Sequence, residues 1–339
     1  VAKLFGVKVE EFGIGYPPRA KKLFTRGGTL FTLNWLPFGG FVKIFGETDS
    51  LNVDKNSFSN QKLWKRLSII IAGVVANMIL AMFLFGLSFT SGFLGNAEDF
   101  PQAKVISESR ITITDIQKDS PASLAGFKTG DALLALSSGE ERTTPSDVAD
   151  VITFVKMHGE KSVHISILRK DTIRTLEVTP TVGVTGSSPG IGISLTSAQK
   201  LRLPFFKAMG YGAEYAVKEF GVIVVTLGSL FKNAVGGDNT LVSQISGPVG
   251  IAQYAGTAFG MGIGSFLFFM ALISVNLAVI NLLPFPALDG GRFILEFFSY
   301  NGRSRISPRV ISVINQVGFV ILIVIMLYAT YHDIAKLVT

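Results

Sequence analysis

The stretch from residue 239 to residue 288 contains no Lys, Arg, Asp, Glu or His, and it ends at the carboxylate of Asp289. Residues 263–283 are long enough to cross a bilayer, because a membrane-spanning helix needs about 20 apolar residues. Pro284 and Pro286 interrupt that helix just before the carboxylate. Interrupted backbone at membrane depth is tolerated only inside protein or beside a water-filled cavity, and an acidic residue there marks a functional site. The stretch therefore predicts a membrane protein in which Asp289 is held in a buried site.

The composition supports a membrane protein that carries a soluble part. Hydrophobic residues make up 48% of the 339 residues, and the absence of Cys excludes disulfides and Cys-based metal sites. The net charge of +7 does not indicate nucleic-acid binding, because the basic residues gather beside apolar stretches, in residues 1–66 and at Arg303, Arg305 and Arg309. Such clusters are typical of cytoplasmic loops. We therefore expect membrane lipid, and no nucleic acid, as a partner.

Three apolar stretches are expected to cross the membrane as helices. They are residues 67–97, residues 263–292 with the interruption near their end, and residues 310–331. Residues 205–231 are ambiguous, since their first half carries several charged residues. The two basic regions should lie on the same side of the membrane, so an even number of crossings separates them. Residues 205–231 are therefore expected to form interfacial amphipathic helices, and the fold class is a polytopic α-helical membrane protein.

Residues 1–66 are expected to form a cytoplasmic region that contains a β-hairpin. Residues 29–45 carry β-branched and aromatic residues on both sides of a break at Pro37, Gly39 and Gly40. That pattern is typical of a short hairpin, and the stretch is too short and too interrupted for a spanning helix.

Residues 98–194 have the composition of a soluble protein, and within them residues 105–182 are expected to fold as an α+β domain. Residues 111–116 alternate between apolar and polar residues as a strand does. Thr144 followed by Pro145 indicates the start of a helix, with Thr144 as the N-cap. The domain is thus inserted between membrane-associated stretches.

The sequence around Asp289 resembles the signature of the site-2 protease family of intramembrane zinc metalloproteases. The match covers residues 274–291 (SVNLAVINLLPFPALDGG) and points to the bacterial branch that cleaves anti-sigma factors and signal-peptide remnants. The resemblance implies that Asp289 is a zinc ligand and that Asn276, Pro284 and Pro286 lie beside the substrate. By spacing alone, an ordinary Asp-Gly-Gly turn at a helix end would explain the same residues equally well.

Further segments match the same family in its order. Residues 72–77 (AGVVAN) resemble its AGPxAN motif with Val74 in place of the usual Pro, and residues 246–251 (SGPVGI) resemble its SGPxGI segment. Asn77 is then either close to the metal or a helix-packing residue. Residues 29–45 resemble the family's membrane-associated β-hairpin, which is thought to present the substrate as an extended strand, and a packing role alone is the alternative.

The soluble domain resembles a bacterial PDZ domain through residues 120–131 (SPASLAGFKTGD). PDZ domains bind a peptide as an added strand between a strand edge and a helix. The resemblance implies an extracytoplasmic domain with a peptide or protein ligand. Its groove is expected between residues 111–116 and residues 146–155.

The family's other two metal ligands and its general base come from an HExxH helix, and this motif does not occur in the sequence. None of His158, His164 and His332 has a second His four residues along the chain. Residues 1–15 resemble the segment that follows HExxH in the family. We therefore expect the sequence to start a few residues after that helix, and residues 1–339 by themselves to bind zinc weakly and to be inactive.

Together these features predict regulated intramembrane proteolysis in a bacterial inner membrane. The reaction is zinc-dependent hydrolysis of a peptide bond within the transmembrane segment of a membrane protein. One alternative is a catalytically inactive membrane-anchored PDZ protein that binds peptides without cutting them. Another is a small-solute carrier, which also suits a broken helix with a buried Asp. The soluble domain and the small number of spans speak against the carrier.

Overall fold

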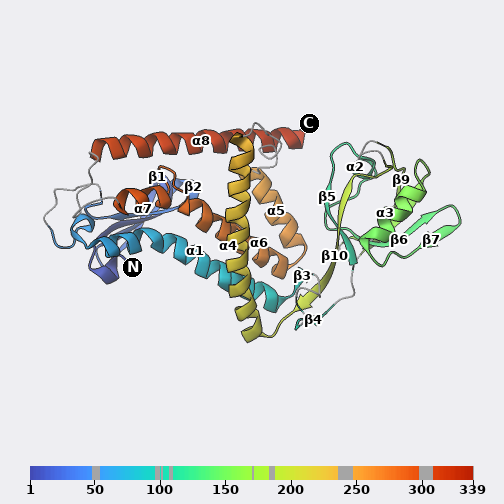
Figure 1. Ribbon diagram of the computed structural model, residues 1–339, viewed down its shortest axis with the longest axis horizontal. Helices are drawn as coiled ribbons and strands as arrows, with labels where there is room; N and C mark the ends of the chain where they lie inside the picture. The colour runs from blue at the N-terminus through green and yellow to red at the C-terminus, as the bar shows by residue number, and fades with distance from the viewer. Residues whose placement is uncertain are drawn as a thin grey trace. The chain divides into compact units, whose positions relative to one another are not determined.

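The computed structural model divides the chain into two compact units (Figure 1). The first comprises Val1–Leu80, Glu219–Pro248 and Ile273–Thr339, and the second comprises Ala81–Lys218 and Val249–Leu272. The residues that the structure describes are 1–47, 54–95, 100, 102–106, 110–169, 172–182, 188–235, 247–297 and 308–338. Ser246 of the SGPxGI segment and the basic residues Arg303 and Arg305 lie outside the described residues.

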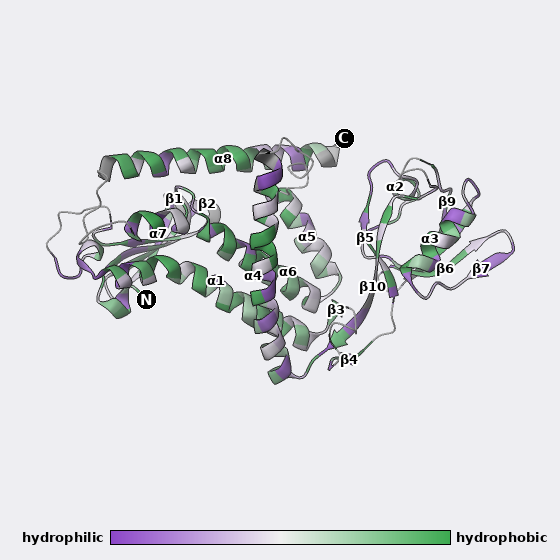
Figure 2. Cartoon of the chain, in the orientation of Figure 1, coloured by the Kyte–Doolittle hydropathy of each residue, from purple (hydrophilic) through white to green (hydrophobic). Residues whose placement is uncertain are grey.

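Three helices in the described part of the chain are long and apolar enough to cross a membrane. They are α1 (Leu63–Ser91), α6 (Ile263–Leu282) and α8 (Pro308–Val338). Helix α4 (Phe205–Val235) is as long as α8, but Figure 2 shows hydrophilic residues recurring along it, whereas α8 is hydrophobic for most of its length. The prediction of three candidate membrane spans is therefore confirmed.

The first of these helices ends earlier than the sequence predicts. The uncharged stretch predicts a helix over residues 67–97, but α1 ends at Ser91. The strand β3 (Phe93–Gly95) follows and pairs with β10 (Ile193–Arg202). Apolar residues serve a strand as well as a helix, so hydropathy alone does not locate this boundary. Ala97 itself lies outside the described residues.

Two long strands near the N-terminus, β1 (Val9–Arg26) and β2 (Thr29–Ile44), pair to form a sheet. The sequence predicts a hairpin within residues 29–45 that turns at the Pro/Gly break. In the structure β1 and β2 are joined by a turn at residues 27–28. The chain also reverses at the predicted break, because residues 30–33 and 40–44 lie on opposite sides of β1, but these two arms pair with β1 and not with each other. The structure differs from the prediction because the many Lys and Arg residues in the second half of β1 hide its strand pattern.

The pairing of this sheet is more complex than that of a simple hairpin. Phe12 of β1 is paired with both Val42 and Phe31 of β2, so the first half of β1 lies between two parts of β2. Side chains of successive residues point to opposite faces of a strand. One face therefore carries exposed apolar side chains, namely Phe12, Ile14, Leu33 and Trp35. The other carries the polar residues Glu11, Thr32 and Asn34.

The second unit contains an eight-stranded sheet, which forms an α/β domain with two helices. The order of its hydrogen-bonded strands is β3-β10-β5-β6-β8-β9, with β4 beside β10 and β7 beside β6. The remaining elements are β4 (Lys104–Val105), β5 (Arg110–Ile116), α2 (Pro121–Leu124), β6 (Ala132–Ser138), β7 (Glu141–Thr143), α3 (Val148–Met157), β8 (Val163–Arg169) and β9 (Thr172–Val178).

The α/β domain extends beyond the predicted boundary of residues 105–182. Strand β10 pairs with β5, with Ile193 opposite Ile116, and Ile191 is buried in the domain core. A domain that ended at residue 182 would lack this strand. The sequence misplaces the boundary because residues 183–190 are rich in Gly, Ser and Thr and read as a linker.

The core of the domain consists of alternate strand residues and one face of α3. Val163, Ile165 and Ile167 of β8 are fully buried, and Phe154 and Val155 of α3 pack in the same cluster. Burial of each such side chain contributes roughly 1.5–3 kcal/mol relative to exposure to water. The domain therefore has a hydrophobic core of its own.

Helix α3 begins at a different cap from the one predicted. Asp147, not Thr144, is the N-cap, and its carboxylate accepts a hydrogen bond of 2.8 Å from the backbone N–H of Asp150. Asp150 accepts hydrogen bonds from the hydroxyl and the backbone of Ser146, which hold the pKa of Asp150 below its usual value. Both the Thr-Pro pair and Asp147 favour the start of a helix, and only the backbone conformation determines which residue is the N-cap.

In the first unit, a small apolar cluster joins the start of α1 to the base of the sheet. Its buried members are Val7, Phe58, Ile69 and Ile70, and Ile44 of β2 packs against them. Phe293 of the short helix α7 (Asp289–Phe297) packs against the same cluster. The remaining elements are the short helices η1 (Lys3–Phe5) and η2 (Phe58–Asn60) and the helix α5 (Pro248–Gly260). Helix α7 is therefore anchored on both α1 and the sheet.

Candidate metal and substrate site

Asp289 is the first residue of α7, directly after the break that follows α6. Its carboxylate is half-buried and faces α1 at Gly73, where an added Cβ atom would lie 3.4 Å from Asp289 Oδ2. The N-terminus of a helix favours a negative charge. The AGVVAN segment and the LDGG segment, far apart in sequence, are thus brought together at the carboxylate.

The two glycines after Asp289 are required by close packing of the backbone. A side chain at Gly290 would collide with the carbonyl group of Leu282, and a side chain at Gly291 would collide with that of Phe285. Helix α7 therefore folds back directly on the end of α6. The Asp-Gly-Gly sequence is therefore part of a tight reversal of the backbone.

The last helix holds the broken segment from another side. Asn315 of α8 accepts a hydrogen bond of 3.3 Å, through Oδ1, from the backbone N–H of Ala287. Ala287 has a positive φ of 71°, a conformation that costs a non-glycine residue free energy and persists only when its surroundings impose it. Gly318 contacts Pro286 so closely that an added Cβ atom would lie 2.7 Å from the proline carbonyl oxygen. Sequence reasoning missed Asn315, although a polar residue inside an apolar span is a signal for a site.

The other predicted site residues lie on α1, on α6 and in the break. Ser274 donates a hydrogen bond of 2.9 Å to the backbone carbonyl of Asn77, which joins α6 to α1. Asn276 is exposed near the end of α6, Pro284 is exposed in the break, and Pro286 is half-buried against α8. The roles of Asn276, Pro284 and Pro286 beside a substrate stay predictions.

The described residues do not form a metal site by themselves. No group of three His, Cys, Asp or Glu side chains within them is arranged to hold a metal ion. His158 contacts Glu141 at 3.1 Å in the α/β domain, and His332 packs beside Tyr328 on α8. A catalytic zinc ion needs about three protein ligands and an open position. The described residues do not supply such a set, and the role of Asp289 as a metal ligand stays a prediction.

Ion pairs that the sequence did not predict surround α7. Arg292 pairs with Glu47, which follows β2, and Glu296 pairs with Arg66 at the start of α1. The side chain of Arg66 is only 4% exposed. Pairs of residues so far apart in the chain leave no local pattern that sequence reasoning can find.

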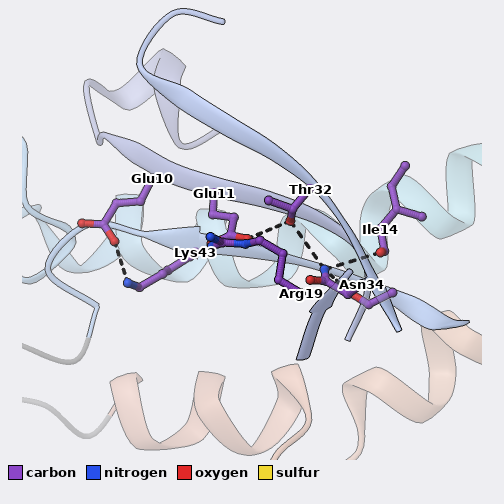
Figure 3. Close-up of polar contacts among 8 residues, drawn as sticks. Glu10, Glu11, Ile14, Arg19, Thr32, Asn34 and Lys43 are labelled. Carbon is purple, nitrogen blue, oxygen red and sulfur yellow. Dashed lines mark hydrogen bonds and ion pairs between the residues drawn. The ribbon is translucent and has the colours of Figure 1, made fainter. Parts of the chain in front are cut away.

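A line of polar contacts crosses the sheet of β1 and β2 (Figure 3). Arg19 and Thr32 both donate hydrogen bonds to the carboxylate of Glu11, at 2.8 and 2.7 Å, and the amide of Asn34 donates to the carbonyl of Gly15 at 3.0 Å. Burial opposes ionisation of Glu11, but the hydrogen bonds from Thr32 and Arg19 outweigh it and hold the pKa of Glu11 below its usual value. These contacts fix the register of the sheet at its centre.

The predicted peptide groove of the α/β domain requires a correction. The sequence places the groove between residues 111–116 and the helix, but β5 pairs with β10 on one side and with β6 on the other. Ile111 and Thr112 of β5 are paired on both sides, and the rest of the strand is paired with β10. The strand that lies beside α3 is β10. Residues 193–196 of β10 pair with β5 alone among the described strands, so the edge next to α3 belongs to β10.

Comparison with known proteins identifies relatives over nearly the whole chain. The model of peptidase family M50 matches residues 1–325. A protein of Clostridium perfringens is 34% identical over 337 residues, which is 98% of this chain and 92% of that protein. A protein of Clostridium acetobutylicum is 30% identical, covering 98% of this chain and 91% of its own length. Both carry the name "putative zinc metalloprotease".

Among solved structures, the PDZ domain of an SdrC-like protein from Listeria monocytogenes matches 27% of this chain and 93% of its own length. The sequence identity is 20% and the TM-score is 0.23. This likeness is too weak to establish the fold of the α/β domain. The match to the family model and the relatives that align over nearly the whole chain establish the family of this chain. Its three long apolar helices are those of a membrane protein. The chain belongs to peptidase family M50, a family of metalloproteases.

Proposed function

We propose that this protein carries out regulated intramembrane proteolysis as a zinc-dependent protease. It hydrolyses a peptide bond within the transmembrane segment of a membrane protein, of the anti-sigma factor or signal-peptide remnant type. The observation that supports this proposal best is the place of Asp289 in a member of family M50. Its carboxylate lies in a backbone break next to an apolar helix and faces a second apolar helix at Gly73.

Asp289 supplies an oxygen ligand to a zinc ion in this proposal. The names of the relatives support zinc as the metal, and hard carboxylate oxygen is compatible with it. When bound, such a metal supplies an activated water and polarises the substrate carbonyl group. The chain itself orients Asp289 through the reversal at Gly290 and Gly291 and through the hydrogen bond between Asn315 and Ala287.

The substrate is expected to bind in an extended conformation. The peptide bonds of a helix are engaged in its own hydrogen bonds, so a transmembrane helix must open locally before it can be cut. Residues 40–43 of β2 are paired with β1, and an opened substrate segment is proposed to be held by strand addition to this sheet. Asn276, Pro284 and Pro286 are proposed to contact the opened segment.

The α/β domain is proposed to bind a peptide or protein ligand in the manner of a PDZ domain. The proposed groove lies between α3 and the open edge of β10. Binding there would regulate which membrane proteins reach the membrane site. Removal of this domain should then alter the cleavage of intact substrates while leaving the zinc content unchanged.

The protein is proposed to lie in the bacterial inner membrane, with residues 1–66 in the cytoplasm and the α/β domain outside. Labelling of single Cys residues tests this orientation well, because the native chain contains no Cys. A Cys at exposed Lys128 should react with an impermeant reagent in intact cells, and a Cys at exposed Lys22 should react only after lysis. The reverse pattern would contradict the orientation.

The catalytic role of Asp289 is tested in the full-length gene product by Asp289→Asn. The amide keeps the size but removes the charge, so we expect cleavage of a model transmembrane substrate to be lost while the protein stays folded and inserted. Asn276→Leu is the matched comparison, and it should impair cleavage while the zinc content remains normal. An Asp289→Asn protein that is active and loaded with zinc would contradict the proposal. It would favour the alternative in which Asp289 is only a turn residue. A wild-type protein that binds peptides but never cuts would favour the inactive PDZ alternative.

A further inference from the structure

Besides Asp289, helix α7 carries two charged side chains, Arg292 and Glu296, one helical turn apart, and each is paired with a residue of another element. Arg292 pairs with Glu47, with side-chain exposures of 32% and 22%. Glu296 pairs with Arg66, with exposures of 17% and 4%. Residues four apart lie on one face of a helix, so both pairs hold the same face of α7. The helix that begins at Asp289 is thus held by two ion pairs in addition to its apolar contacts.

Partly buried pairs such as these are not explained by stability alone. Removing charges from water costs free energy that the attraction between them often only offsets. What such pairs provide is geometry, because a planar guanidinium group binds a carboxylate in few orientations. The guanidinium group of Arg292 also lies over the ring of Phe58, 5.1 Å from its centroid, and Phe58 is only 2% exposed. Arg292 is therefore fixed from two sides by the segment between β2 and α1.

Glu47 links this arrangement to the sheet. One carboxylate oxygen, Oε1, pairs with Arg292, and the other, Oε2, accepts a hydrogen bond of 3.3 Å from the backbone N–H of Ile44. Ile44 is the last residue of β2. A continuous path of polar contacts therefore runs from the end of β2 through Glu47 and Arg292 to the helix whose first residue is Asp289.

We propose that Glu47 and Arg292 are positioning residues that hold the sheet of β1 and β2 in a fixed register with Asp289. A peptide strand added to this sheet would then be placed at a defined distance from the carboxylate of Asp289. Neither residue touches the substrate or the metal in this proposal, and each acts through the other. The inference rests on the proposed function for its effect on cleavage, but the coupling of the sheet to α7 is a property of the chain itself.

The kinetic test uses Glu47→Gln, Arg292→Gln and the double variant in the full-length, membrane-inserted protein. Glu47→Gln keeps an acceptor for the Ile44 N–H and removes only the charge. Each single variant should lower kcat about tenfold or more, since a misplacement of about 1 Å can cost about a hundredfold. The KM and the zinc content should stay close to those of the wild type. The double variant should lose no more than either single variant, because residues that act through one contact are not additive.

Glu177→Gln is the control for loss of a carboxylate from an ion pair. Glu177 lies 3.9 Å from His164 in the α/β domain, and both side chains are largely exposed. This variant should keep the wild-type kcat. Additive losses in the double variant, or a normal kcat in both single variants of an active protein, would overturn the proposal.

Hydrogen exchange in zinc-free protein tests the coupling without any catalysis. Arg292→Gln, which changes α7, should accelerate exchange of the backbone amides at residues 40–44 of β2. Glu47→Gln should in turn accelerate exchange in the first turn of α7. Unchanged exchange at β2 in Arg292→Gln would overturn the coupling. If the wild type neither binds zinc nor cuts, the proposed function fails, but this measurement still decides whether the two elements are coupled.

Discussion

Alternate residues of β8 in the α/β domain are completely buried, whereas along α8 most of the apolar side chains are exposed. Val163, Ile165 and Ile167 have no exposed surface, but Val317 and Val324 of α8 are 54% and 58% exposed. The contacts that hold α8 within its unit include two polar ones. Asn315 accepts from the N–H of Ala287, and Asp333 accepts from the N–H of Gly247.

The difference is the one expected between a region that folds in water and a region that packs in a lipid bilayer. In water, burial of apolar surface drives folding at roughly 25 cal/mol per Å². In a bilayer an apolar side chain gains little by leaving lipid for protein, so helices associate through small residues and hydrogen bonds. The close contacts of Gly73 with Asp289 and of Gly318 with Pro286 are of this kind. The membrane site therefore depends on a few exact fits, and the α/β domain depends on a large core.

The strongest test of this comparison removes one strand from the α/β domain. A fragment of residues 105–203 should unfold cooperatively, and a fragment of residues 105–182 should not. The shorter fragment lacks β10 and with it Ile191, Ile193 and Leu195, which pack in or against the core. Chemical denaturation followed by circular dichroism distinguishes the two. A cooperative transition of the shorter fragment would mean that β10 is not part of the folding unit.

In the membrane region, a single methyl group should have the next largest effect. Gly318→Ala should destabilise the protein by about 1–3 kcal/mol, because the added carbon overpacks against Pro286. The matched control is Gly221→Ala in α4, where nothing lies within 4 Å of the added carbon. There the change should stabilise the helix by up to about 1 kcal/mol. Thermal unfolding in detergent measures both, and the same sign for the two variants would contradict the close fit.

A smaller effect is expected at the start of α3. Asp147→Ala removes the N-cap of α3 and should destabilise the fragment of residues 105–203 by about 1 kcal/mol. Thr144→Ala should change the stability much less, since Thr144 is not the cap in the structure. Denaturation midpoints of the two variants decide between the caps. A larger loss for Thr144→Ala would restore the cap that the sequence predicts.

The smallest effect is the pH dependence of the same helix start. Hydrogen bonds from Ser146 lower the pKa of Asp150 in the folded state, so its ionised form stabilises folding above the pKa of the unfolded chain. That contribution is lost as the pH falls through the lowered pKa. The difference in unfolding free energy between the wild-type fragment and Asp150→Asn should therefore shrink on acidification. A difference that stays constant down to about pH 3 would show that the carboxylate charge is not involved.

The sequence alone predicts the features that depend on local composition. An uncharged stretch of sufficient length predicts each of the three candidate membrane helices, because the bilayer imposes a length and an apolar character on any helix that crosses it. The two prolines predict the break before Asp289 for the same local reason, since proline cannot continue a helix. The motif that ends in Asp-Gly-Gly identifies the family.

The tertiary structure decides what those local patterns leave open. It ends α1 at Ser91, pairs β2 with β1, and adds β10 to the α/β domain. It also brings Gly73 to Asp289 and Glu47 to Arg292. These outcomes rest on contacts between residues far apart in the chain, and such contacts have no signature in the hydropathy of either partner. Local sequence sets what a segment can become, and packing against distant segments selects among those possibilities.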